Sequence, residues 1–192
     1  MDSPAPPRTP WLRAWGKGAW VIIALATAAL VVLVIARFGA TWTIVPLLPL
    51  ALATPLLAAI DLRWRIVPNR LVLPLALVLL ATASASALIE AQPLRIVGAL
   101  LGAAAMFAVY LAPALLTRRA MGMGDVKLAL ALGTVLGASG WQTWFLGVLA
   151  GFIAGAVAGL VLLLARRATL RSRIPYAPAM LVGAWLALLA QG

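Results

Sequence analysis

The sequence predicts an all-α fold, a polytopic bundle of about seven transmembrane helices. Hydrophobic residues make up 65% of the 192-residue chain and charged residues only 10%, whereas a soluble domain carries about 25% charged residues. The apolar residues also form long unbroken runs, and not the short alternating segments of a membrane β-barrel. A lipid bilayer is the environment that suits such a chain.

Seven apolar stretches follow a polar, proline-rich N-terminal tail, residues 1–17. We expect the first to be a retained span, because it is long for a signal peptide and no small-residue cleavage site precedes Arg37. The fifth and seventh are short for a bilayer core that needs about 20 residues, so flanking residues lengthen them, or they are tilted or shielded by neighbours. The stretches are Trp20–Ala36, Trp42–Ile60, Leu71–Ile89, Ile96–Thr117, Val126–Ser139, Trp144–Ala165 and Ala177–Ala190.

The distribution of basic residues predicts the orientation. With seven spans, 13 of the 15 Lys and Arg residues lie on one side of the membrane, and only Arg37 and Arg95 lie on the other. Basic residues accumulate in cytoplasmic loops, so we expect a cytoplasmic N-terminus and an external C-terminus. The net charge of +11 is therefore interpreted as topology and not as nucleic-acid binding. The 13 residues are Arg8, Arg13, Lys17, Arg63, Arg65, Arg70, Arg118, Arg119, Lys127, Arg166, Arg167, Arg171 and Arg173.

The available side chains restrict the chemistry. The chain has no cysteine and no histidine, which excludes disulfides, thiolate zinc sites, a cysteine nucleophile and histidine-based catalysis. We expect no metal and no cofactor. Of the four acids, Asp2 and Glu90 are expected to be solvated, whereas Asp61 ends the second apolar stretch and Asp125 opens the fifth. Both would lie at similar depth on the cytoplasmic side, and a carboxylate there is a functional candidate.

Two facing carboxylates indicate one particular chemistry. They can share a proton, so that one activates a water and the other polarises a peptide carbonyl. The helix dipole favours charge on Asp125 at a helix N-terminus and disfavours it on Asp61 at a helix C-terminus, so we expect Asp61 to hold the proton. The alternative is a non-catalytic membrane transporter or assembly scaffold, with Asp61 and Asp125 as ion or proton sites.

Glycines precede the second carboxylate in the segment GMGDVKL, residues 122–128. The backbone freedom of Gly122 and Gly124 would let the chain turn at the helix entrance and let a substrate strand approach Asp125. Lys127 either orients Asp125 or extends to the membrane interface, and both readings stay open. A further glycine stripe, residues 151–159, is typical of close helix packing.

These motifs together resemble the type IV prepilin peptidase family, which are membrane aspartic peptidases with a G-x-G-D motif. Asp61 is followed by Val67-Pro68-Asn69, similar to the family's Asp and aliphatic-Pro-Asn pattern, and GMGDVKL matches the family's second motif throughout. A third segment, IPYAPAMLVGAW from Ile174, is a softer match, because Ala177 stands where glycine is more usual. The resemblance covers roughly residues 42–190.

The resemblance implies a bacterial inner-membrane enzyme with about six core spans, Asp61 and Asp125 as catalytic pair, and Gly122, Gly124, Lys127, Pro68 and Asn69 in support. Its partners would be membrane lipids and a prepilin or pseudopilin precursor, whose basic leader is removed at the cytoplasmic face. Residues 1–17 would be a cytoplasmic tail, 18–40 an added span and 41–192 the peptidase domain. The chain looks like the short, Tad/Flp-type form, which lacks the paired C-x-x-C insert of larger members, so we expect no N-methylation.

Overall fold

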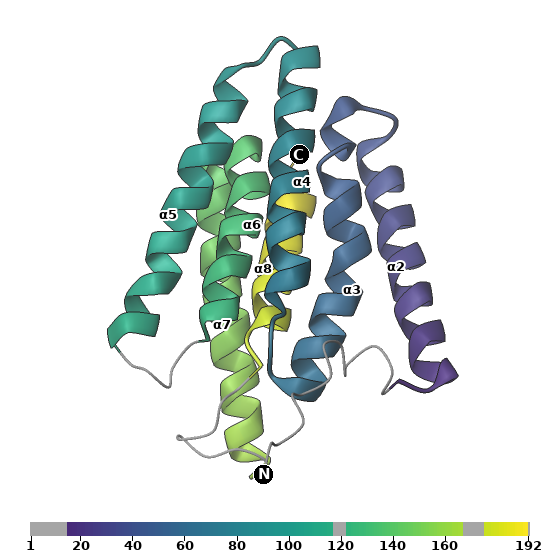
Figure 1. Cartoon of the computed structure of the whole chain (residues 1–192), viewed down its shortest axis with the longest axis vertical. Helices are drawn as coiled ribbons and strands as arrows, with labels where there is room; N and C mark the ends of the chain where they lie inside the picture. The colour runs from purple at the N-terminus through teal and green to yellow at the C-terminus, as the bar shows by residue number, and fades with distance from the viewer. Residues whose placement is uncertain (1–14, 117–121, 167–174, 192) are drawn as a thin grey trace, which may run out of the picture.

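Helices account for all the regular structure in the described part of the chain. The structure is a computed structural model, and it describes residues 15–116, 122–166 and 175–191. Each of the seven predicted apolar stretches forms a helix, which confirms the predicted fold class (Figure 1). The elements are α2 (Lys17–Phe38), the 3₁₀ turn η1 (Trp42–Ile44), α3 (Leu47–Trp64), α4 (Asn69–Ile89), α5 (Leu94–Leu116), α6 (Met123–Ser139), α7 (Trp141–Leu164) and α8 (Ala177–Leu189).

The helices divide into long outer ones and short inner ones. Five segments are long and apolar enough to cross a membrane: α2, η1 with α3, α4, α5 and α7. The 17 residues of α6 and the 13 of α8 correspond to about 26 Å and 20 Å of helix, less than the ~30 Å hydrocarbon core. Most side chains of both short helices are buried. Shielding by neighbours therefore explains their length, because a helix enclosed by protein need not match the lipid thickness.

Glycines fix the position of α6 inside the bundle. Gly98 and Gly102 of α5 face Gly133 and Gly137 of α6, and a Cβ on Gly98 would lie 2.5 Å from the carbonyl oxygen of Gly137. The two backbones thus touch directly, which only glycine permits. Trp144 adds a hydrogen bond from its indole N–H to the carbonyl oxygen of Gly102, at 2.9 Å. The second half of α6 is consequently packed rigidly against α5.

Basic residues gather at one end of the bundle. The helices alternate in direction, so the starts of α2, α4, α6 and α8 share an end with the last turns of α3, α5 and α7 (Figure 1). Among the described residues this end carries Lys17, Arg63, Arg65, Arg70, Lys127 and Arg166, and the opposite end carries Arg37 and Arg95. The predicted partition of charge therefore matches the arrangement of the helices. Arg8, Arg13, Arg118, Arg119, Arg167, Arg171 and Arg173 lie outside the described residues.

Helix α2 is the most peripheral of the long helices. Only Val34 of its 22 residues is buried, and its main neighbour is α3. At its end, Arg37 donates hydrogen bonds from Nε to the carbonyl oxygen of Leu189, at 3.3 Å, and from Nη2 to that of Gln191. Helix α2 is thus attached to the bundle mainly along α3 and through Arg37.

Candidate active site

Asp61 lies in the last turn of α3 and is held by a different helix. Its side chain is 3% exposed. Helix α3 ends three residues later, where Arg65 adopts a left-handed conformation (φ 54°) and its N–H bonds back to the carbonyl oxygen of Asp61 at 2.7 Å. The Oδ2 atom of Asp61 accepts the backbone N–H of Ala177, at 3.0 Å. Because Ala177 is the first residue of α8, the carboxylate lies at a helix N-terminus 116 positions away in sequence.

Asp125 caps the helix to which it belongs. It is the third residue of α6, is 9% exposed, and its Oδ2 atom accepts the N–H of Gly122 at 3.2 Å. The carbonyl oxygen of Gly122 in turn accepts the N–H of Asp125 at 3.0 Å. This reciprocal arrangement satisfies backbone groups that a helix start leaves unpaired. The other carboxylate atom, Oδ1, is buried and has no hydrogen-bond partner.

The two carboxylates both lie at the basic end of the bundle. They interact electrostatically with each other, although they come from α3 and α6. Each is also bound by a backbone N–H at a helix N-terminus, Asp61 at α8 and Asp125 at α6. The sequence predicted the charge on Asp125 and the proton on Asp61, because each acid was considered only with the helix that carries it. In the structure the N–H of Ala177, at the start of α8, also binds Asp61. The helix dipoles therefore no longer distinguish the two acids. Such a pair can hold one proton and one charge between its members.

The glycines serve close packing and not a special backbone conformation. Gly122 has φ −80°, which any residue adopts, and Gly124 lies within α6. The first expected reason for glycine, a turn that needs unusual dihedral angles, is therefore wrong, and the second, access of a substrate strand to Asp125, stays a prediction. A Cβ on Gly124 would instead lie 2.8 Å from both Cβ and the carbonyl oxygen of Val67. Gly124 is thus the point where the start of α6 touches the Val67-Pro68-Asn69 segment.

A side-chain bond joins the same two segments. The ammonium group of Lys127 donates to Oδ1 of Asn69, the first residue of α4, at 3.1 Å. Pro68 occupies the N-cap position before it, and no side chain caps this helix. The hydrogen-bond partner of Lys127 is Asn69 and not Asp125, which does not favour the reading in which Lys127 orients Asp125 directly. The reading in which it extends to the membrane interface stays a prediction. All five supporting residues predicted from the sequence nevertheless lie around the contact between the starts of α4 and α6.

Sequence reasoning missed two tyrosines beside the carboxylates. Tyr110 of α5 is fully buried, and its ring centroid lies 6.0 Å from that of Tyr176, which immediately precedes α8. Both tyrosines interact electrostatically with Asp125. Burial raises the pKa of Tyr176 to about 12, so its hydroxyl is a neutral donor at physiological pH. The sequence offered one hint that these residues matter, because the chain contains only two tyrosines.

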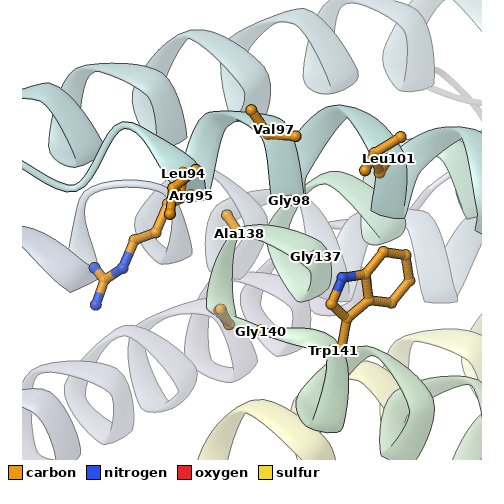
Figure 2. Close-up of a pocket in the computed structure, with 10 residues that line it drawn as sticks. Leu94, Arg95, Val97, Gly98, Leu101, Gly137, Ala138, Gly140 and Trp141 are labelled. Atoms are coloured by element: carbon orange, nitrogen blue, oxygen red, sulfur yellow. The ribbon is translucent and has the colours of Figure 1, made fainter.

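A hollow at the opposite end of the bundle lies away from the carboxylates. It measures about 380 Å³ and lies between the start of α5 and the junction of α6 with α7, where Gly98, Gly137 and Trp141 line it (Figure 2). Figure 2 shows the Arg95 side chain extending away from the other lining residues, and its guanidinium forms an ion pair with Glu90. Glu90 is thus paired. Across the described ranges, no three acidic side chains come together as a metal site would require.

Comparisons with known proteins agree with this geometry. Residues 48–160 match the model of the type IV leader peptidase family, and both Asp61 and Asp125 fall inside the match. Among similar curated proteins is the prepilin leader peptidase/N-methyltransferase of Aeromonas salmonicida (strain A449), 37% identical over 95 residues, which are 49% of this chain and 32% of that protein. The proteins of the same name from Stutzerimonas stutzeri and Pseudomonas putida are 38% identical over 93 residues (48% of this chain, 31% of the relative) and 33% identical over 98 residues (50% and 33%). The match therefore spans about a third of each relative. No solved structure matches the chain significantly.

Proposed function

We propose that this chain, which belongs to the type IV leader peptidase family, is an integral-membrane aspartic endopeptidase. Its substrates would be prepilin or pseudopilin precursors. The observation that carries the proposal is the pair of buried, mutually interacting carboxylates, Asp61 and Asp125. Both belong to the motifs of the family resemblance. The curated relatives, which are named as prepilin leader peptidases, support the same class of substrate.

The carboxylates would divide the work of peptide hydrolysis. One, ionised, removes a proton from a water that attacks the scissile carbonyl carbon. The other, protonated, donates to the carbonyl oxygen as negative charge develops there. Collapse of the tetrahedral intermediate breaks the C–N bond, and the new amine takes a proton from the carboxyl pair. The N–H groups of Gly122 and Ala177 hold the two side chains in fixed orientation throughout.

The substrate is inferred from the position of the site in the bundle. The carboxylates lie at the basic end, which the positive-inside rule assigns to the cytoplasm. A multi-pass protein of the bacterial inner membrane, with its N-terminus in the cytoplasm and its C-terminus outside, follows from this orientation. Its substrate would have a short basic leader and an apolar helical stem that partitions into the bilayer. Anionic lipid headgroups would attract the leader to the surface at about 1 kcal/mol per cation.

We also propose that the chain cleaves without methylating its product. It contains no cysteine, so it lacks the paired C-x-x-C that accompanies methylation in larger family members. Within the chain, residues 1–17 would be a cytoplasmic tail, residues 18–40 an added span, and residues 41–192 the peptidase domain. The peripheral attachment of α2 supports this division.

Cleavage of a prepilin by membranes that contain the protein tests the proposal. We expect a leader-sized mobility shift that persists with a chelator, and a product whose mass shows no methyl group when S-adenosylmethionine is supplied. Asp61→Asn and Asp125→Asn should each abolish the shift. Glu90→Gln is the matched control, because it removes a carboxylate at the opposite end of the bundle. Cleavage that persists in either aspartate variant would contradict the aspartic mechanism.

A further inference from the structure

Three buried polar atoms near the carboxylate pair make no hydrogen bond of good geometry, although the two hydroxyls among them lie close enough for one phenol to donate to the other. They are the hydroxyl oxygens of Tyr110 and Tyr176 and the Oδ1 atom of Asp125. Buried polar groups in proteins are nearly always hydrogen-bonded, so each such atom needs an explanation. Here the three atoms are complementary, because the phenolic hydroxyls can donate and the carboxylate oxygen can accept.

The tyrosine rings are held tightly in place. The Tyr110 ring stacks on Phe152 of α7, with centroids 5.1 Å apart, and is inclined to the Tyr176 ring. Two glycines of α7 make room for them: a Cβ on Gly151 would lie 3.2 Å from the Tyr110 hydroxyl, and a Cβ on Gly155 would collide with the Tyr176 ring. The predicted close packing of this glycine stripe is thus confirmed at Gly151 and Gly155, and its effect is to place two hydroxyls deep in the bundle.

The segment at the start of α8 contacts both carboxylates. The N–H of Ala177 binds Asp61 at 3.0 Å, and the side chain of the preceding residue, Tyr176, interacts with Asp125. Tyr110 approaches Asp125 from α5. The aspartate whose Oδ1 lacks a partner is therefore also the one whose charge acts on both phenols.

We propose that Tyr110 and Tyr176 are positioning residues, whose hydroxyls, linked to each other, donate to Oδ1 of Asp125 directly or through one buried water. These bonds complement the N–H of Gly122 on Oδ2 and fix the plane of the carboxylate toward the substrate. A neutral phenol also stabilises the ionised carboxylate without adding a charge. The catalytic meaning of this arrangement rests on the proposed function, whereas the hydrogen bonds themselves do not.

The surroundings of Asp125 allow a clean test. The titratable groups on the elements packed against α6 are Arg70 of α4, Tyr110 of α5 and Tyr176 before α8, with Arg95 at the far end of α5. Helix α7 and helix α8 contain none, and Asp61 of α3 is the charged partner already described. Replacing either tyrosine by phenylalanine removes a single hydroxyl and keeps the aromatic packing.

The experiment compares Tyr110→Phe and Tyr176→Phe with the parent protein in detergent. The first measurement is independent of cleavage. The infrared band of the Asp125 carboxyl group is identified by its absence in Asp125→Asn, and its intensity is then recorded against pH to give a titration midpoint. We expect its midpoint to rise by about one pH unit in each variant, the order expected for one lost hydrogen bond to a carboxylate. Phe145→Leu is the control, because it truncates an exposed aromatic side chain of α7 and removes no donor; its midpoint should stay at the parent value.

The second measurement is the rate of prepilin cleavage. We expect kcat to fall roughly tenfold in each variant while KM stays within about twofold, since positioning acts on the reacting group and not on substrate binding. Unchanged midpoints in both phenylalanine variants would overturn the inference, whatever the cleavage rates. An inactive parent protein would overturn the proposed function instead, and the titration would still decide the inference.

Discussion

Substitution of Gly124 by alanine is the sharpest probe of how the two motifs are held together. The added Cβ would lie 2.8 Å from Cβ and the carbonyl oxygen of Val67, and ordinary contact begins at 3.4 Å, so the segments must separate by at least about 0.6 Å. The carbonyl is backbone and cannot rotate away. Because Gly124 is followed directly by Asp125, the shift reaches the carboxylate.

The magnitude follows from the geometry. Overpacking of a tight contact costs about 1–3 kcal/mol, and the better helix propensity of alanine offsets up to about 1 kcal/mol of it. A displacement approaching 1 Å in a reacting group can reduce catalysis about a hundredfold. We therefore expect kcat/KM for prepilin cleavage to fall roughly tenfold to a hundredfold, with a loss of only about 1–2 kcal/mol in the free energy of unfolding.

The assay measures cleavage and thermal unfolding on the same purified sample. Gly18→Ala is the control, because no atom lies within 4 Å of its added Cβ, and it should leave both quantities unchanged or slightly raise stability. Full activity in Gly124→Ala would refute the argument that this contact positions Asp125. A protein that unfolds completely would show that the contact holds the bundle and not merely the site.

Two further predictions concern the supports of the site. Lys127→Met and Asn69→Ala should each lower the rate of cleavage about threefold to tenfold, because both remove the same 3.1 Å hydrogen bond. The double variant should lose no more than either single variant, and losses that add up would contradict a shared bond. Arg166→Met is the control. A chain that starts at residue 41 should still cleave prepilin with KM within about twofold of the parent, because α2 buries only Val34. Its midpoint of thermal unfolding should fall by a few degrees as the Arg37 bonds are lost, and a folded but inactive truncation would refute the assigned domain boundary.

The helices could be predicted from the sequence because hydrophobicity alone determines them. Each apolar stretch became a helix, and Pro46 explains the one divided stretch, since α3 begins directly after it. The distinction between outer and inner helices could not be read in the same way. Lipid and protein interior are equally apolar, so the composition of α6 and α8 resembles that of their neighbours, and only their length indicated that they are enclosed.

The candidate site was predictable in its residues but not in its bonds. Asp61 and Asp125 could be paired because the other two acids lie far from any matching position in the topology. The donor to Asp61 could not be predicted, because Ala177 contributes a backbone N–H, which every residue except proline has. The reason for Gly124 was equally hidden, since it depends on Val67 approaching from another element.

The difference in helix length explains how the carboxylates are buried near the end of a bundle. Helices α6 and α7 are joined by Gly140 alone, so the end of α6 and the start of α7 lie at the same level at the opposite end. Because α6 has 17 residues and α7 has 24, α7 extends about 10 Å beyond the start of α6 at 1.5 Å per residue, and Figure 1 shows this overhang at the basic end. Asp125 therefore lies about 10 Å short of the end of α7 along the bundle. On the proposed function, a precursor must bring its backbone to the level of Asp125, and a peptide bond there is accessible only if the stem is not helical at the cut.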